Sequence, residues 1–345
     1  MYGKELMLEN MGLGINKKEM GILAILGIIA LIAIFSMVRK TPKPSILTEL
    51  AKPGIVLAVG GQPGQAPGEF DYPRGLAVDS HGNIYVADSL NNRVQEFSGN
   101  NWKLVRIFGK FGKISGPPSV LDTQGKGALN QPNGVAIGPH GSVYVTDTWN
   151  QRVEVFNPNG SFKMAFAPLD GFYGPRAVAV SKEGMIYVAD TGKHRIVEFN
   201  HQGQEVRTWG KKGSQIGEFD EPIGLAIGSQ GDLYVADRLN FRIQVFTANG
   251  KFLRTWPVHG WSVQQINMEP HLALDTQKKI LYVSDGRRRK VYAYTLQGRL
   301  IQTYFKNSQN KNLFDIPIGV AVDSDGSLLV SDAGADHIMK LKGAH

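Results

Sequence analysis

A block of residues recurs six times along this chain, and the repeat constrains the fold more than any other feature. Two of its best copies run from Pro73-Arg-Gly-Leu-Ala-Val to Tyr85-Val-Ala-Asp88 and from Pro222-Ile-Gly-Leu-Ala-Ile to Tyr234-Val-Ala-Asp237. The aspartates that close each copy's second apolar run are spaced 43 to 59 residues apart: Asp88, Asp147, Asp190, Asp237, Asp285 and Asp332. A period of roughly 40–50 residues with several short strands per unit is typical of a β-propeller. The repeat therefore predicts an all-β propeller.

Each copy predicts four strands. In the first copy these are Gly75–Val78, Ile84–Ala87, Arg93–Phe97 and Leu104–Phe108, separated by turn residues. The second of them is continuously apolar, as expected for a strand that is buried on both faces of its sheet. Six such units predict six blades.

The last copy has only three strands, because four residues follow Leu341. Residues 55–59, just before the first copy, have the pattern of the missing strand. We therefore expect this amino-terminal strand to complete the sixth blade, which would close the ring and remove its open edge. The predicted propeller domain is residues 55–345.

The recurring blocks Pro-x-Gly-[Leu/Val]-Ala, Tyr-Val-[Ala/Thr]-Asp and Asn-x-Arg-[Val/Ile]-x-x-Phe resemble the NHL repeat over residues 55–341. The resemblance is weakest in the last two copies, where Lys290 and His337 replace the arginine and Leu329 replaces the tyrosine. It implies a six-bladed NHL-type propeller. The family includes a peptidylglycine amidating lyase, protein-binding and RNA-binding propellers, and bacterial sensor or surface domains, so the fold leaves function open.

Residues 20–38 contain no charged residue and no proline, and nineteen helical residues would span nearly 30 Å, the thickness of a bilayer core. We predict one transmembrane helix here, followed by a linker at 39–54 and preceded by a cytoplasmic terminus or leader at 1–19. Basic residues flank the helix on both sides almost equally, so charge alone does not orient it. A large carboxyl-terminal domain translocates despite such flanks, and we expect a single-pass protein of the cell membrane whose propeller is extracytoplasmic.

Gly14 is followed by Glu19 and then by the apolar run, which weakly resembles a type IV prepilin signal. Such a signal implies cleavage after the glycine and assembly of the helices into a filament. Asn16, Lys17 and Lys18 are polar where that family is mostly apolar. A plain anchor is the alternative.

Each repeat aspartate has a basic residue five positions later: Arg93, Arg152, Arg195, Arg242, Lys290 and His337. Catalysis needs one asymmetric constellation, whereas a fold needs the same contact in every blade. We therefore interpret these pairs as structural.

Functional residues are expected where the copies differ. The residues after the repeat prolines should ring one mouth of the channel: Arg74, Asn133, Arg176, Ile223, His271 and Ile318. The neighbouring second turns add Trp149, Leu239, Arg287 and Arg288. From these we predict a ligand-binding set of Arg74, Asn133, Trp149, Arg176, His271 and Arg287. Its three arginines favour anionic or carboxylate groups.

An insertion at residues 111–130 lengthens the first repeat and should emerge on the same face. It has the length of a lid or docking loop. A surface excursion without a role is the alternative.

These observations favour a binding module for a peptide, glycan or protein, which is the function that the mouth residues support best. The alternative is a metal-dependent lyase or lactonase-like enzyme, for which only Asn133 and His271 are plausible ligands. No Gly-x-Ser-x-Gly, His-Glu-x-x-His or phosphate-loop motif is present, so the sequence assigns no catalytic residues, and we predict no metal and no cofactor. A pilin-like filament subunit, or another homo-oligomer, is the third reading. The formal net charge of +8 is modest, and no nucleic-acid partner is expected.

Overall fold

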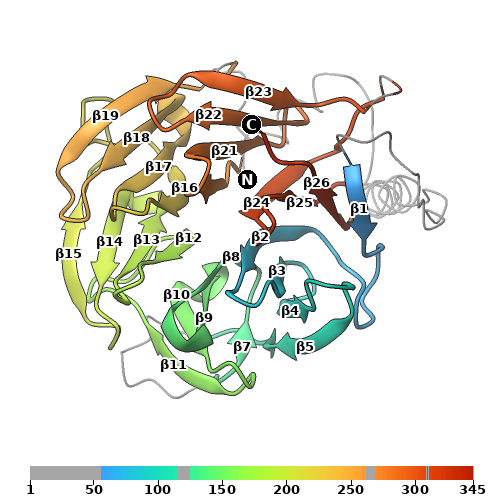
Figure 1. Cartoon of the computed structure of the whole chain (residues 1–345). Coiled ribbons are helices and arrows are strands. Elements are labelled where there is room, and N and C mark those ends of the chain that lie inside the picture. Colours follow the sequence, from blue (N-terminus) through green and yellow to red (C-terminus); the bar gives the residue numbers. More distant parts are fainter. Residues whose placement is uncertain are drawn as a thin grey trace, which may run out of the picture. The chain divides into compact units, whose positions relative to one another are not determined.

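The computed structural model describes residues 56–114, 125–258, 260–261, 269–307, 309 and 311–344. In this part of the chain, six four-stranded antiparallel sheets form a ring around a central channel (Figure 1). The prediction of a six-bladed propeller is confirmed.

Each blade runs from an inner strand at the channel to an outer strand. Blade 1 holds β2 (Pro73–Val78), β3 (Ile84–Asp88), β4 (Arg93–Phe97) and β5 (Leu104–Phe108). Blade 2 holds β8 (Pro132–Ile137), β9 (Val143–Asp147), β10 (Arg152–Phe156) and β11 (Phe162–Phe166). Blade 3 holds β12 (Pro175–Val180), β13 (Ile186–Asp190), β14 (Arg195–Phe199) and β15 (Glu205–Trp209).

The remaining blades follow the same plan. Blade 4 holds β16 (Pro222–Ile227), β17 (Leu233–Asp237), β18 (Arg242–Phe246) and β19 (Phe252–Pro257). Blade 5 holds β20 (Leu272–Asp275), β21 (Ile280–Asp285), β22 (Lys290–Thr295) and β23 (Leu300–Tyr304). Blade 6 holds β24 (Pro317–Val322), β25 (Leu328–Asp332), β26 (His337–Leu341) and β1 (Val56–Gly60).

The ring closes through its amino-terminal strand, as predicted. β1 pairs antiparallel with β26, with Val59 opposite Met339 and a register shift between Val56 and Ala58. The last blade is thus built from both ends of the propeller, and its sheet has the same four strands as the others.

The core consists of layers between adjacent blades rather than one central cluster. One layer joins Ala189 of blade 3 to Val235 of blade 4, and another joins Phe108 of blade 1 to Val145 of blade 2. The second strand of a blade faces a layer on each side, which is why every residue of β13 is buried. Each blade therefore depends on both of its neighbours for the burial of its apolar side chains.

The pairing of repeat aspartate and arginine is confirmed in four blades. The arginine Nε lies 2.7 to 2.9 Å from the aspartate carboxylate in these pairs: Arg93–Asp88, Arg152–Asp147, Arg195–Asp190 and Arg242–Asp237. In blade 6, His337 lies 4.0 Å from Asp332. Blade 5 departs from the prediction, because Asp285 pairs with Arg288 at 3.8 Å while the ammonium of Lys290 lies over the Phe305 ring.

These pairs also fasten the linker that enters each blade. Asp88 accepts a hydrogen bond from the backbone N–H of Asp71 at 2.8 Å, and the Arg93 guanidinium donates to the carbonyls of Gln65, Ala66 and Glu69. The same contacts recur around Asp237 and Arg242. Buried backbone groups of an irregular linker need such partners, so the motif is structural.

The predicted leader, membrane segment and linker at residues 1–54 lie outside the described residues. The helices that the described part contains are the three-residue turns η1 (Pro139–Gly141), η2 (Thr148–Asn150), η3 (Thr191–Lys193) and η4 (Arg238–Asn240). Within that part, no helix has the length and apolar character needed to cross a membrane.

Candidate functional site at the channel mouth

One face of the ring, here called the mouth face, carries the linkers into the inner strands and the turns between second and third strands. The residues after the repeat prolines were predicted to line it. The residues before those prolines lie there too: Tyr72, Gln131, Gly174, Glu221, Glu269 and Ile316. The repeat therefore places two rings of variable side chains on this face.

The floor of the mouth is a contact between opposite blades. The Nε2 atom of His271 in blade 5 lies 3.1 Å from the Oδ1 atom of Asn133 in blade 2, and both residues are buried. Ile223 and Ile318, also predicted at the mouth, are buried as well. Burial lowers the pKa of His271 to about 4, so its imidazole is neutral at neutral pH.

The amide of Asn133 is only half satisfied. Its Nδ2 atom is buried and has no hydrogen-bond partner. If the His271 tautomer and the amide orientation were both reversed, the Asn133 oxygen would be the atom left without a partner. A buried polar atom in this state is uncommon and costs free energy, so the floor retains one unused hydrogen-bonding group.

Above the floor, two of the predicted arginines converge on one carboxylate. Arg74 of blade 1 places its Nε atom 3.0 Å from Oε2 of Glu269, and Arg176 of blade 3 donates to Oε1 of the same side chain. Burial opposes ionisation of Glu269, but the charges of Arg74 and Arg176 outweigh it and hold the pKa of this carboxyl below its ordinary value. Glu269 is therefore a carboxylate at neutral pH.

Further polar groups position this cluster. Arg74 donates to the Ser89 hydroxyl at 3.0 Å, and its guanidinium lies 5.0 Å from the centre of the Tyr72 ring. A third arginine, Arg238, pairs with Glu221 at 2.5 Å. With three arginines and two glutamates, these described groups carry a net positive charge.

The other predicted residues do not join this cluster. Trp149 on η2 is 64% exposed, and its indole nitrogen donates to the Gln131 side chain at 2.8 Å. Arg287 is exposed on the turn after β21, and no contact joins it to Arg74 or Arg176 within the described residues. The structure thus brings together Arg74 with Arg176, and Asn133 with His271, and leaves Trp149 and Arg287 apart from both pairs.

Sequence reasoning missed Glu269, Tyr72 and Arg238. The first two precede a repeat proline, and the third follows the repeat aspartate of blade 4. Tyr72 has a φ of 57° and Glu221 a φ of 53°, a left-handed conformation at the residue before the proline. The sequence did contain a sign of these residues: the residue before the repeat proline differs from copy to copy, as the residue after the proline does.

The insertion after blade 1 begins and ends beside the turn of blade 2. Its base is the parallel pair of β6 (Lys110–Phe111) and β7 (Ala128–Leu129). Asn150 on η2 accepts from the backbone N–H of Ile114 and donates to the carbonyl of Gly112. The base therefore lies on the mouth face, whereas residues 115–124 are outside the described part.

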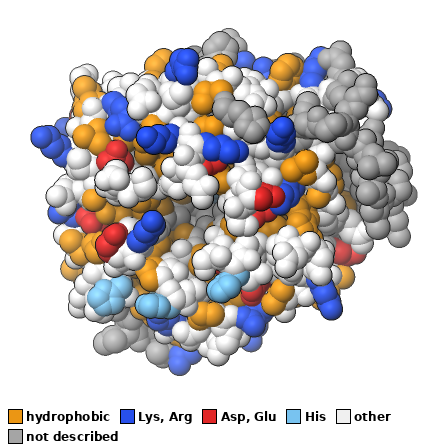
Figure 2. Space-filling view, viewed as in Figure 1, with side chains coloured by type: hydrophobic (Ala, Val, Ile, Leu, Met, Phe, Trp, Pro, Cys, Tyr) orange, Lys and Arg blue, Asp and Glu red, His pale blue; other side chains and the backbone are white. Residues whose placement is uncertain are grey.

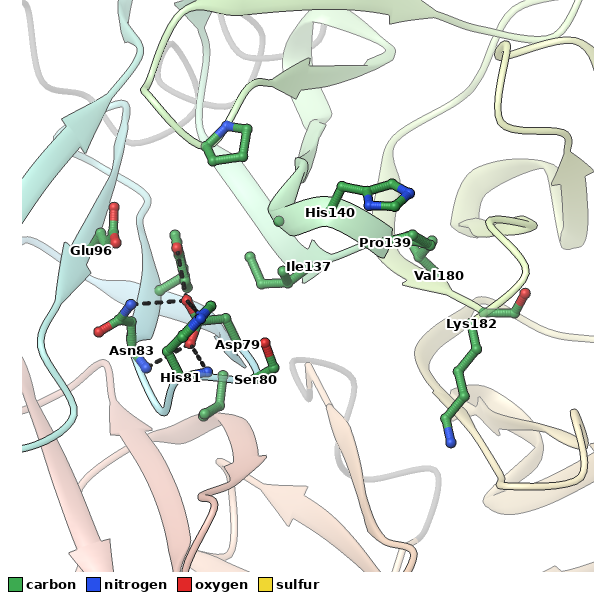
Figure 3. A pocket seen from close by; sticks show the side chains of 16 residues that line it. Asp79, Ser80, His81, Asn83, Glu96, Ile137, Pro139, His140, Val180 and Lys182 are labelled. Atoms are coloured by element: carbon green, nitrogen blue, oxygen red, sulfur yellow. Dashed lines mark hydrogen bonds and ion pairs between the residues drawn. The ribbon is translucent and has the colours of Figure 1, made fainter.

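The face opposite the mouth also carries hollows. A channel cavity of about 300 Å³ is lined by the inner strands of all six blades. A second cavity, of about 700 Å³, lies between the first turns of blades 1, 2 and 3 (Figure 3). In it Asp79 accepts from the backbone N–H groups of His81 and Asn83, so its carboxylate organises its own turn.

Figure 2 shows a hollow near the centre of the face in view, with apolar side chains inside it. Lysine and arginine side chains are scattered over this face among acidic and apolar groups. The described side chains in this view form no single basic patch.

Within the described residues, no three or more histidine, aspartate or glutamate side chains are placed to hold one metal ion. His271 and Asn133 bind each other, and Glu269 binds arginines.

Four segments match the NHL repeat family: residues 70–97, 129–156, 172–199 and 219–246. NHL repeat-containing protein 3 of Homo sapiens is 31% identical over 112 residues, which are 30% of this chain and 29% of that protein. NHL-repeat-containing protein 4 of Homo sapiens is 30% identical over 99 residues, which are 29% of this chain and 63% of that protein. The chain thus matches less than two thirds of the length of either relative.

Several solved structures share the fold. A streptogramin B lyase is 14% identical with a TM-score of 0.54, over 81% of this chain and 95% of that chain. A gluconolactonase from Xanthomonas campestris is 13% identical with a TM-score of 0.58, over 84% and 98%. A chain of a nidogen/laminin complex is 17% identical with a TM-score of 0.55, over 74% and 86%. At such identities the likeness is one of fold.

Proposed function

Since this chain carries NHL repeats in a six-bladed β-propeller, we propose that it is a binding module whose mouth face holds a peptide, glycan or protein partner. The observation that carries the proposal is the convergence of Arg74 and Arg176, from two different blades, on a single carboxylate. Guanidinium groups recognise carboxylates through directed, charge-assisted hydrogen bonds. The mouth has the groups needed to bind an anionic part of a partner.

Exposed apolar side chains on the same face support a macromolecular partner. Trp149 is 64% exposed, Tyr173 is 65% exposed, and Leu169 is fully exposed. They belong to the η2 turn of blade 2 and to the linker that enters blade 3. Large apolar side chains beside charged groups are typical of interaction surfaces, and aromatic rings also stack on sugars and peptides.

The predicted binding residues have different parts in this proposal. Arg74 and Arg176 bind the anionic group, and Asn133 with His271 forms the floor beneath it. Trp149 and Arg287 are rim contacts for the outer part of the partner.

The second candidate is a lyase or lactonase-like enzyme. One observation favours it: His271 lines the channel as a neutral imidazole, the form of histidine that binds a metal ion. Titrating the full-length protein with zinc or calcium, with elemental analysis of the washed product, tests the metal-dependent form. Stoichiometric metal that is lost in a His271→Ala variant would favour the enzyme, and a metal-free protein would favour the binding module.

The position in the cell is also a proposal, based on residues 20–38. We propose a single-pass anchor that holds the propeller on the extracytoplasmic side, with a filament as the alternative. The intact mass of the native protein tests these. A chain that begins at Ile15 would support prepilin-type cleavage and assembly, and a chain that begins at Met1 would support the plain anchor.

The binding proposal is tested with arrays of peptides and glycans, probed with the full-length protein in detergent. The double variant Arg74→Ala, Arg176→Ala should lose the bound set. Arg299→Ala is a matched control, because Arg299 is an exposed arginine between the third and fourth strands of blade 5, on the opposite face. Binding that survives the double variant would show that the mouth is the wrong site.

A further inference from the structure

We propose that Glu269 is an internal substitute for the ligand: its carboxylate occupies the anion site of the mouth, and the partner enters by presenting a carboxylate of its own in exchange. The inference deepens the binding function proposed above and rests on it. It assigns the ligand's chemical class, an aspartyl, glutamyl, uronate or chain-terminal carboxylate, and it gives the mouth a built-in competitor.

The geometry around Glu269 is that of a bound ligand. Its two carboxylate oxygens contact different arginines, Oε2 near Nε of Arg74 and Oε1 with Arg176. These arginines come from β2 and β12, two inner strands that are separated in the ring by blade 2. Glu269 belongs to neither strand, because it lies in the linker that precedes β20. An independent carboxylate placed between the two guanidinium groups would make the same two contacts.

The internal carboxylate does not saturate the site. Nε of Arg74 and Oε2 of Glu269 lie 3.0 Å apart, yet both atoms are buried without a hydrogen bond, because the pair is close but not aligned. Below them, Asn133 retains a buried amide atom without a partner. A ligand carboxylate is free to align with Arg74, whereas Glu269 is constrained by its own backbone.

Charge balance specifies an anionic ligand. When the Glu269 side chain leaves, Arg74 and Arg176 lose their shared counterion, and Glu221 remains paired with Arg238. Two partly buried cations without a counterion are unfavourable, so a neutral group cannot replace Glu269 at low cost. A carboxylate restores the balance that the closed mouth already has.

The experiment compares the wild type with Glu269→Gln, using N-acetyl-L-glutamate as the probe and N-acetyl-L-glutamine amide, in which both carboxyl groups are amides, as its neutral counterpart. Affinity is measured by calorimetry, and the Nε–H signals of the arginines are followed by NMR. We expect Glu269→Gln to bind N-acetyl-L-glutamate at least tenfold more tightly than the wild type, with shifts at Arg74 and Arg176. Neither protein should bind the glutamine derivative.

Matched variants keep the test independent of folding and of overall charge. Glu183→Gln removes the same charge at a fully exposed residue between the first two strands of blade 3, and it should behave as the wild type does. Glu269→Asp keeps the charge but shortens its reach, and it should give an intermediate affinity. If Glu269→Gln does not fold, Glu269→Asp alone decides the question.

Two results would overturn the inference. The first is a folded Glu269→Gln variant that binds N-acetyl-L-glutamate no better than the wild type does. The second is an equal gain in affinity for N-acetyl-L-glutamate in Glu183→Gln, which would show that the loss of one negative charge anywhere on the protein explains the effect. If either occurs while array binding still depends on Arg74 and Arg176, the binding function stands and only the role of Glu269 is lost. If Glu269→Gln binds N-acetyl-L-glutamate more tightly but the wild type binds no member of the arrays, Glu269 does occupy an anion site, and the proposed partner classes are wrong.

Discussion

The ion pairs that fasten the linkers and the ion pairs of the mouth lie on the same face of the ring but follow opposite rules. In blades 1 to 4, every fastening pair joins an aspartate to an arginine five residues later, with nearly the same distance. At the mouth, by contrast, Arg74 and Arg176 meet a glutamate from a distant linker, a contact that no other blade repeats within the described residues. Repetition marks what the fold needs from each blade, and a departure from repetition marks where a specific site can form.

A smaller difference within the fastening pairs makes the same point. Gln95 and Gln244 stand two residues after the arginine in blades 1 and 4, and each donates its amide to the repeat aspartate. Blade 2 has Glu154 there, so Arg152 contacts two carboxylates, Asp147 at 2.9 Å and Glu154 at 2.8 Å. Burial raises the pKa of Glu154 to about 8, with the Arg152 charge opposing and the Asp147 charge adding. One exchanged side chain makes this pair sensitive to pH.

The largest effect is expected for Arg152→Met. Arg152 is fully buried between the carboxyl groups of Asp147 and Glu154, and at pH 7, where Glu154 holds its proton, its removal leaves the Asp147 carboxylate buried without a counterion. We expect the free energy of unfolding to fall by about 3–5 kcal/mol, measured by urea denaturation at pH 7. A loss below about 1 kcal/mol would contradict the structural role of these pairs.

The next effect is a change in pH dependence in Glu154→Gln. The folded protein holds the Glu154 proton up to about pH 8, whereas the unfolded chain releases it near its ordinary pKa of 4.5. The wild type therefore binds more protons when folded, and Glu154 costs stability increasingly as the pH rises from 4.5 to 8. Relative to the wild type, Glu154→Gln should gain ~1–3 kcal/mol between pH 5 and pH 8.

The reciprocal variant Gln95→Glu sharpens this test, because it gives blade 1 the carboxylate of blade 2. It should acquire a loss of stability with rising pH over the same range. A flat difference from the wild type in both variants would show that Glu154 titrates normally.

At the mouth, we expect the same substitutions to affect binding strongly and stability only weakly. Arg74 and Arg176 are partly exposed, so alanine at either position should lower the free energy of unfolding by only about 1 kcal/mol. Partner binding should nevertheless be lost. If these variants unfold as readily as Arg152→Met, the mouth pairs are fold elements and the contrast between the two regions fails.

The smallest change in stability is expected for Trp149→Ala. The indole is largely exposed and has one hydrogen bond, to Gln131. Its loss should alter the free energy of unfolding by less than about 0.5 kcal/mol, while binding of the partner weakens roughly tenfold. Unchanged binding would remove Trp149 from the interaction surface.

The sequence was sufficient for the fold because the repeat is local. The proline, the aspartate and the basic residue of each copy lie within about twenty residues, so their relation is visible in a single unit. The mouth was only partly predictable. Arg74, Arg176, Asn133 and His271 were identified because each follows a repeat proline. Which of them contact one another depends on the geometry of the closed ring, and this is not visible in a single repeat.

Glu269 shows why the remaining mouth contacts could not be predicted from the sequence. It lies almost two hundred residues from Arg74, and in the sequence it resembles any surface glutamate. Only closure of six blades brings it between two arginines. The membrane segment at residues 20–38 remains a prediction from hydrophobicity and length.

The closure of the ring by β1 has a mechanical consequence. A force applied to the chain ahead of residue 56 enters the propeller through the five residues of β1, and it is borne first by their hydrogen bonds to β26. The pairing of β1 with β26, here called the seam of blade 6, has its register shift between Val56 and Ala58. Its hydrogen bonding is therefore least regular at the end where the force is applied. Under tension, the seam of blade 6 should yield before any other blade. A propeller held by its amino-terminal end would then open by separation of β1 from β26, while its other five sheets remain folded.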